Sequence, residues 1–333
     1  MEKNKRLTAI DYTRALAIIL VVAGHWQPDV IPGWWRSAVS LIYTFHMPLF
    51  LAMSGYLYMY TLGRHSYPRF LEGKVKRLLI PYVTTSVIVI TIKLFSQSDG
   101  AYVQNPVGLS SYLEIFYLPA AGYYLWFIWA LWWMFVITPL FRSRTARTLL
   151  FAATLLLAAA PFDLPEIFCL QQTKQMYVFF MFGVMLYDWK QRIPLNNRTA
   201  SASTMALFIL LLALHAGGLT IADPIIPYVS VYAIISAFAI AEARLRRSSL
   251  NALLTAIAAA SYIIYLFHTT CEGFVKSLAM KFGLLSTNLS FALTAAAAIA
   301  AGTLLPLLLQ RYVLNRFRLT AFLFGLPHRS EKP

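Results

Sequence analysis

Long apolar blocks alternate with short, basic polar segments along the whole chain. Each block approaches the roughly 20 residues that an α-helix needs to cross the hydrocarbon core of a bilayer. Hydropathy therefore predicts an all-α, polytopic membrane protein with about ten spanning helices. The predicted spans are 8–27, 37–60, 79–96, 123–141, 147–161, 174–189, 200–217, 224–243, 252–270 and 289–311. The loops are too short for a second folded domain, so we expect one membrane domain over 1–333.

The first apolar block also resembles a signal peptide, because Lys3, Lys5 and Arg6 precede an apolar core. However, Asp11 and Arg14 interrupt the approach to that core, and no good Ala-x-Ala cleavage site follows. We therefore expect an uncleaved first helix.

Segments rich in lysine and arginine alternate along the chain with segments that contain few, as the positive-inside rule requires. With the N-terminus inside, the inner segments hold 22 of the 28 lysines and arginines, and the outer segments hold five. The inner segments are 1–7, 61–78, 142–147, 190–199, 244–251 and the short tail from Arg311. Both termini are therefore expected in the cytoplasm.

The composition agrees with this class of protein. Hydrophobic residues make up 59% of the chain and charged residues 12%, against about 25% charged in soluble domains. The net charge of +15 needs no nucleic acid, because basic inner loops and anionic lipid headgroups account for it. The two cysteines, Cys169 and Cys271, fall near outer loops, and both a disulfide and two free thiols remain open.

The first predicted helix carries ionisable residues on one face. Arg14 and His25 are eleven residues apart, which places them on the same face about 16 Å apart along the axis. Asp11, three residues before Arg14, joins that face and can pair with the arginine. Ionisable residues inside a span suggest function by default. The alternative is a structural ion pair with an interfacial histidine.

The second predicted span contains "FHMPLFLAMSGYLY" at 45–58. His46 lies near the depth of His25, and Pro48 is expected to kink the helix. A lone histidine beside aromatic residues is more often a packing residue than a catalyst. Two histidines at one depth in neighbouring spans favour a shared site.

A basic segment precedes the third predicted span. It contains Arg69, Lys74, Lys76 and Arg77. Such segments most often bind lipid headgroups. If the third helix begins early, Lys74 and Arg77 share a face and suit a phosphate-bearing ligand.

Taken together, these motifs resemble the membrane acyltransferase-3 family. Arg14 and His25 match its arginine-or-lysine, ten residues, histidine pattern in the first helix. Further segments resemble its second-helix signature, its RxxR motif, its fourth-helix stretch and its late SYxxYLxH stretch, namely 45–58, 74–77, 124–133 and 260–268. Lys74 replaces the first arginine of RxxR, which keeps the charge and loses the bidentate geometry.

The resemblance covers about residues 7–315 and implies a single acyltransferase-3 domain of ten helices. It implies transfer of an acyl group, usually acetyl from acetyl-CoA, to a sugar hydroxyl of a surface polysaccharide or its lipid-linked precursor. The acceptor classes are O-antigen, capsule and exopolysaccharide, and the FHMPLF subgroup is similar to fucose 4-O-acetylases. The expected setting is a bacterial inner membrane, with acetyl-CoA, a glycan and the lipid bilayer as partners and no nucleic acid.

These residues support a mechanism with His25 as general base toward the sugar hydroxyl. Arg14 stabilises negative charge on the donor, Asp11 holds Arg14, and His46 orients the acceptor or shares the proton. The basic residues of 69–77 bind the CoA phosphates. CoA is cytoplasmic whereas His25 lies near the outer face. Either the pantetheine arm threads inward or an enzyme residue carries the acetyl group, and both routes remain open.

Aromatic residues gather around the fourth span and allow two interpretations, an interfacial belt or a sugar-stacking surface. They are Tyr123, Tyr124, Trp126, Trp129, Trp132 and Trp133. Polar residues of the outer half include Asp163, Glu166 and Glu272, and His268 is a further candidate for the cavity.

Two other classes of protein fit the buried charges. A flippase or transporter for a polysaccharide precursor needs them along a pathway, although no inverted repeat is visible. A scaffold or signalling protein would use them for packing alone. No zinc spacing, P-loop or dinucleotide fingerprint appears, so we expect neither metal nor nucleotide-hydrolysis chemistry.

Overall fold

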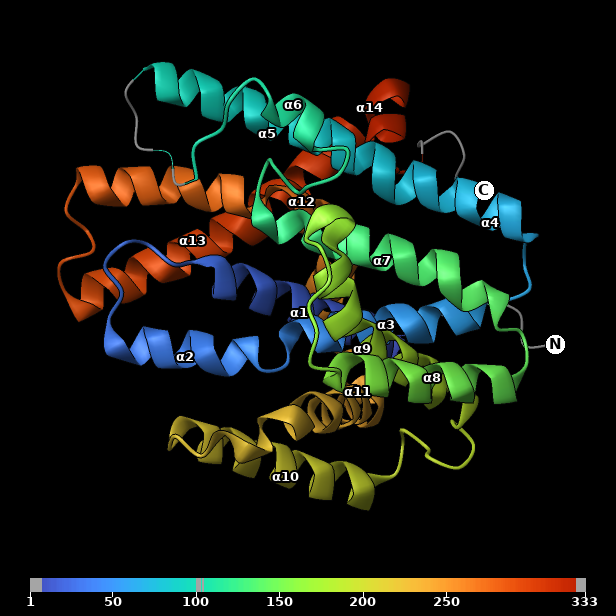
Figure 1. Ribbon diagram of the computed structural model, residues 1–333. Coiled ribbons are helices and arrows are strands. Elements are labelled where there is room, and N and C mark those ends of the chain that lie inside the picture. The colour runs from blue at the N-terminus through green and yellow to red at the C-terminus, as the bar shows by residue number, and fades with distance from the viewer. Residues whose placement is uncertain (1–7, 100–102, 104, 328–333) are drawn as a thin grey trace. The chain divides into compact units, whose positions relative to one another are not determined.

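The computed structural model describes residues 8–99, 103 and 105–327, and these residues form helices and loops without a β-strand (Figure 1). The α-helices are α1 (Thr8–His25), α2 (Gly33–Tyr43), α3 (His46–Thr61), α4 (Tyr67–Lys74), α5 (Ile80–Ser98), α6 (Ser111–Glu114), α7 (Trp126–Ile137), α8 (Arg144–Ala159), α9 (Leu170–Asp188), α10 (Arg198–Ala216), α11 (Ile226–Leu245), α12 (Leu250–Lys281), α13 (Asn288–Leu309) and α14 (Arg318–Leu323). Two π-helical segments, Val75–Leu79 and Gln310–Leu314, continue α4 and α13.

Every predicted span falls on helical structure, which confirms the all-α, multi-pass class. Within the described residues, eight helical segments are long and apolar enough to cross a membrane. The two remaining predicted spans correspond to α8, which has 16 residues, and α9, which begins with polar residues. The number of crossings and the cytoplasmic location of the termini therefore stay predictions.

The second predicted span is two helices rather than one. It divides at Thr44 and Phe45, where a turn separates α2 from α3. Pro48 is the third residue of α3, a position in the first turn where its missing N–H breaks no helical hydrogen bond. The expected kink is thus a break placed just before the proline, and His46 becomes the first residue of α3.

Two helices are longer than the hydropathy pattern indicated. α12 continues to Lys281 instead of ending near 270. At a rise of 1.5 Å per residue its 32 residues extend about 48 Å, more than a bilayer core needs. The third span also begins early, because α4, the first π-helical segment and α5 form one run over 67–98.

The chain divides into two compact units. The first comprises Met1–Leu57 and Phe182–Leu307, and the second comprises Tyr58–Met181 and Leu308–Pro333. Both boundaries of the inserted segment fall inside helices, α3 and α9. The expectation of one domain over the full chain therefore stays a prediction.

The core of the first unit is built by α1, α3, α10, α11 and the end of α9. Fully buried residues there include Ala17, Leu49, Ala52, Ile226 and Val231. Helices α10 and α11 lie side by side along much of their length (Figure 1). α1 also packs along α12, so the polar face of α1 has a protein neighbour.

Glycine permits a close helix approach inside this unit. A methyl group at Gly183 of α9 would lie 1.8 Å from the backbone oxygen of Ala52 on α3. This distance is far below van der Waals contact, so only glycine fits there.

In the second unit, buried side chains fix two loops. The hydroxyl of Tyr82 on α5 donates to the carbonyl oxygens of Ile115 and Leu118 at 2.7 and 2.9 Å. The ammonium of Lys174 on α9 donates to the carbonyl oxygens of Ala160 and Phe162. Predicted as an outer basic residue, Lys174 is thus a buried loop anchor.

Candidate active site

The polar face of α1 meets α12 at an arginine. Nη2 of Arg14 donates to Oγ of Ser261 at 2.8 Å, and Nη1 of Arg14 lies 3.8 Å from Oδ1 of Asp11. The predicted Asp11–Arg14 pair is therefore present, and Ser261 is an additional partner. Ser261 belongs to the "ASYIIYLFH" stretch, so the motif itself indicated a polar residue at this contact.

The N-terminal end of α1 is hydrogen-bonded to residues just before and at the start of α12. The hydroxyl of Tyr12 donates to Oδ1 of Asn251 at 2.7 Å, and Nη2 of Arg246 donates to Oγ1 of Thr8 at 2.8 Å. These two hydrogen bonds fix the register of α1 against α12. Arg14 and His25 consequently have defined neighbours.

The hydrogen bonds of three histidines define their tautomers. In each ring, Nδ1 lies 2.8 Å from a backbone carbonyl oxygen three or four residues earlier in the chain. The carbonyl belongs to Val21 for His25, to Ile42 for His46 and to Tyr265 for His268. A carbonyl oxygen only accepts, so Nδ1 carries the hydrogen in each ring. In the neutral form Nε2 then holds the lone pair, which is the atom a general base uses.

These three imidazoles belong to one cluster of rings. His25 and His268 meet edge to face with their centroids 4.9 Å apart. The ring of Tyr43 connects His25 to His46. Its centroid lies 6.4 Å from that of His25 and 4.8 Å from that of His46. The structure thus brings His25 and His46 into one cluster together with His268, the further candidate from the sequence, and adds Tyr43.

Glu272 extends the polar face of α12 beyond His268. It lies one helical turn after His268 and its side chain is 4% exposed. A methyl group at Gly302 of α13 would lie 3.3 Å from Oε1 of Glu272 and 2.7 Å from Cγ1 of Val22. Oε1 is buried and has no hydrogen-bond partner among the described residues. Glu272 is one of the polar residues that the sequence predicts in the outer half, and its four-residue spacing from His268 places both on one face of α12.

The predicted phosphate-binding residues belong to the second unit and differ in their exposure and contacts. Arg69, Lys76 and Arg77 are exposed, and Nζ of Lys76 pairs with Glu72. Lys74 is half-buried, and its Nζ lies 3.6 Å from the centroid of the Phe135 ring.

The segment that contains Lys74 and Arg77 is not a regular α-helix. Lys74 ends α4, whereas Arg77 lies inside Val75–Leu79. A π-helix has more residues per turn than an α-helix, so the α-helical periodicity behind the same-face expectation does not apply across this turn. The shared face of Lys74 and Arg77 therefore stays a prediction.

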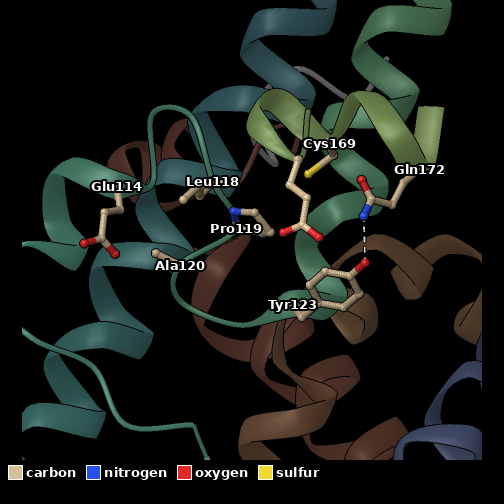
Figure 2. A pocket seen from close by; sticks show the side chains of 8 residues that line it. Glu114, Leu118, Pro119, Ala120, Tyr123, Cys169 and Gln172 are labelled. Carbon is tan, nitrogen blue, oxygen red and sulfur yellow. Dashed lines mark hydrogen bonds between the residues drawn. The ribbon is translucent and has the colours of Figure 1, made fainter. Parts of the chain in front are cut away.

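A pocket of about 200 Å³ lies in the second unit, between the loop that follows α6 and the start of α9 (Figure 2). Its lining residues are Glu114, Leu118, Pro119, Ala120, Tyr123, Glu166, Cys169 and Gln172. Nε2 of Gln172 donates to the Tyr123 hydroxyl at 2.7 Å (Figure 2). The two carboxylates supply hydrogen-bond acceptors to this lining, whereas the amide oxygen of Gln172 is buried.

The backbone around this pocket is held in place by hydrogen bonds. The amide of Phe168 donates to the carbonyl oxygen of Tyr117 at 2.7 Å, and Nε1 of Trp133 donates to the carbonyl oxygen of Phe168 at 3.2 Å. Phe168 and Cys169 both have positive φ, at 56° and 53°. Such strain persists where surrounding contacts over-determine the conformation, so the pocket walls are preorganised.

Both cysteines are free thiols, Cys169 buried and Cys271 half-buried. Burial raises the pKa of the Cys169 thiol to about 12. Over the described ranges, no group of three or more histidine, cysteine, aspartate or glutamate side chains is placed to hold a metal ion.

Comparison with known proteins gave a family and two relatives. A family model described as an acyltransferase domain matches residues 7–311. Nodulation protein NolL of Sinorhizobium fredii is 33% identical over 189 residues, and that of Mesorhizobium japonicum is 28% identical over 189 residues. Each alignment covers 55% of this chain and 49% or 48% of the relative.

The chain therefore spans about half the length of the curated relatives it matches. No solved structure matches it significantly.

Proposed function

Because this chain belongs to the acyltransferase-3 family, we propose that it is an integral membrane O-acetyltransferase. It moves the acetyl group of acetyl-CoA to a hydroxyl of a surface polysaccharide or of its lipid-linked precursor. The setting that fits this acceptor is a bacterial inner membrane. The alternative from the sequence is a transporter for a polysaccharide precursor without acyl transfer.

The main support for this proposal is the tautomer of His25. Its Nδ1–H is used by the Val21 carbonyl, so Nε2 of the neutral ring is the atom that accepts a proton. In the reaction, Nε2 takes the proton of the sugar hydroxyl while the sugar oxygen attacks the thioester carbonyl carbon. The carbon–sulfur bond then breaks, and the proton passes from the imidazolium to the CoA thiolate.

Arg14 is proposed to stabilise negative charge on the acyl donor. Its guanidinium is held by Ser261 and lies near Asp11, so it is positioned before the donor arrives. Preorganised charge of this kind stabilises a transition state without reorganisation during the reaction. The basic residues of 69–77, exposed apart from Lys74, are proposed to bind the CoA phosphates.

The pocket of the second unit supports a sugar as the acceptor class. Carboxylate oxygens of Glu114 and Glu166 accept hydrogen bonds. A ligand rich in hydroxyl donors matches such a lining, and an acidic sugar does not. We therefore propose that this pocket contacts a neutral or amine-bearing sugar of the acceptor.

The test uses purified full-length protein in lipid nanodiscs with radiolabelled acetyl-CoA and the surface polysaccharide of the source cell. His25→Ala is expected to lower transfer by about 10²–10⁴-fold, the usual contribution of a general base. His65→Ala, at an exposed histidine outside the cluster, is the matched control and should transfer at the wild-type rate. Transfer retained by His25→Ala would remove the assigned role, and acceptor movement without acetylation would favour a transporter.

The same labelled reaction distinguishes the two routes for the acetyl group. Rapid quenching without acceptor leaves radioactivity on the protein only if a residue carries the acetyl group. Direct attack on a threaded thioester leaves none. Either result is compatible with His25 as the base for the sugar hydroxyl.

A further inference from the structure

Three polar side chains of the first unit form a second hydrogen-bonded array, which shares no residue with the histidine cluster. Oγ of Ser40 on α2 lies 3.0 Å from Nε2 of His215. Nδ1 of His215, in the last turn of α10, lies 2.8 Å from Oδ1 of Asp223. Asp223 belongs to the short 3₁₀ segment Thr220–Ile225.

The order of donors follows from the chemistry of the three groups. An ionised carboxylate only accepts, so Nδ1–H of His215 donates to Asp223. Nε2 then accepts the hydroxyl hydrogen of Ser40. A serine whose hydrogen is directed to Nε2 of a histidine, itself oriented through Nδ1 by an aspartate, is the arrangement of a Ser–His–Asp triad.

The end of α10 explains how Asp223 returns to His215. The amide of Gly218 donates to the carbonyl oxygen of His215 at 2.9 Å, and Leu219 donates to that of Leu214 at 2.9 Å. Gly218 has a φ of 87°, a left-handed conformation that glycine adopts without strain. The chain therefore reverses directly after the helix, and the next turn presents Asp223.

The nucleophile is accessible and has a cation beside it. Ser40 is exposed, whereas the side chain of His215 is only 14% exposed. Arg36, also exposed, lies four residues before Ser40 on α2. This spacing puts the two side chains on one face with a rise of about 6 Å. A guanidinium there can stabilise an oxyanion formed at a carbonyl attacked by Ser40.

We propose that Ser40, His215 and Asp223 form a second acyl-transfer centre that accepts an acyl group from an oxygen ester onto Ser40. Nε2 of His215 takes the Ser40 proton as Oγ attacks the ester carbonyl carbon. The carbon–oxygen bond to the alcohol breaks, and the alcohol leaves with that proton. Water or another hydroxyl then attacks the acyl-serine in the same manner and releases Ser40.

This centre lies at the C-terminal end of α10. The charges of the loops predict that this end is on the outer side of the membrane. An ester of a membrane-bound or exported sugar is the substrate class that reaches this position. The proposal goes beyond the acetyl-CoA reaction at His25, although a sugar acetate made there is one such ester. Ser40 would then remove or relocate an acetyl group.

The test is reaction of the full-length protein in nanodiscs with a fluorophosphonate probe, followed by peptide mass spectrometry. Labelling of Ser40, together with hydrolysis of p-nitrophenyl acetate, is expected. Ser40→Ala and His215→Ala abolish both signals. Ser37→Ala is the matched control, because Ser37 lies one turn earlier on α2 and its hydroxyl donates to the carbonyl oxygen of Gly33.

Asp223 is tested as the residue that orients His215, and Arg36 is tested as the residue that stabilises the oxyanion. Asp223→Asn is expected to slow labelling by at least about 100-fold, since the amide stabilises the wrong tautomer of the imidazole, and Asp223→Glu should recover part of the rate. Arg36→Gln slows labelling as well. Unchanged thermal unfolding in these variants separates the loss from misfolding.

A thiol variant gives an independent measurement. Ser40→Cys should react with iodoacetamide at least tenfold faster than Ser37→Cys, because His215 removes the thiol proton. Equal alkylation rates, or the absence of labelling at Ser40 in the wild-type protein, would overturn the proposal. His25→Ala should lose acetyl-CoA-dependent transfer and keep Ser40 labelling, so failure of one proposal is distinguished from failure of the other.

Discussion

Arg14 and Ser261 are joined by a hydrogen bond of 2.8 Å between Nη2 and Oγ, which holds the guanidinium of α1 against α12. Asp11 lies 3.8 Å from the other guanidinium nitrogen. The charge of Arg14 is therefore positioned from two helices. Removing either partner tests whether that position matters for acetyl transfer.

Ser261→Ala is expected to lower acetyl transfer less than Arg14→Ala. The serine variant loses one hydrogen bond to a charged group, worth about 1.5–3 kcal/mol, and leaves Asp11 in place. The arginine variant also removes the Asp11–Arg14 ion pair. A double-mutant cycle on transfer rates should give a coupling of about 0.5–3 kcal/mol between the two positions. Additive effects would show that the contact is incidental, and Ser54→Ala, whose hydroxyl donates within its own helix, should change little.

Arg77→Met is expected to raise the KM for acetyl-CoA more than Lys74→Met does. Arg77 is exposed and presents a fork that suits phosphate, whereas the Lys74 ammonium lies over the Phe135 ring. Loss of a hydrogen bond to a charged phosphate corresponds to roughly a ten- to hundredfold rise. Steady-state kinetics over a range of acetyl-CoA and salt concentrations provides the measurement.

Lys190→Met is the control for the basic segment. Lys190 lies over the ring of Tyr187 with its Nζ 4.1 Å from the centroid, so it matches Lys74 in chemistry but belongs to the turn after α9. The KM of this variant for acetyl-CoA should equal that of the wild-type protein. A larger rise for Lys190→Met than for Arg77→Met would place the phosphates elsewhere.

Gly183→Ala is expected to destabilise the first unit. The added methyl group would overlap the backbone oxygen of Ala52, and overpacking of this kind costs about 1–3 kcal/mol or more. Gly273→Ala on α12, where nothing lies within 4 Å of the added carbon, should instead stabilise by about 0.4–1 kcal/mol. Thermal unfolding in detergent compares the two variants, and equal shifts would contradict the close helix approach.

Cys169 is expected to resist maleimide at pH 8 in the folded protein. Burial raises its pKa to about 12, above the usual value of about 8.5, so the reactive thiolate is roughly a thousandfold rarer than in a free cysteine. The thiolate fraction rises tenfold for each pH unit below that pKa, and labelling should accelerate accordingly between pH 8 and pH 10. Mass spectrometry of a Cys271→Ser variant follows this single site, with the denatured protein as the reference.

Rapid labelling of folded Cys169 at pH 8 would show that the thiol is accessible and ionised. That result would contradict the packing around the pocket. A disulfide-linked Cys169 would also resist maleimide, and reduction before labelling excludes that explanation.

The sequence alone determined the membrane class and the residues of the polar face. Apolar blocks near 20 residues cannot fold as exposed soluble helices, so their positions predicted helices that the structure confirms. The eleven-residue spacing fixed the common face of Arg14 and His25, because helical periodicity is a local property. The family match agrees with motifs readable in the chain.

Only the tertiary structure decided which distant side chains meet. The partners Ser261 and His268 of the first helix lie about 240 residues away in the chain, a separation over which periodicity carries no information. Ser40 of α2 likewise meets His215 of α10 across 175 residues of the chain. Local spacing therefore fixed faces, whereas packing between helices fixed partners.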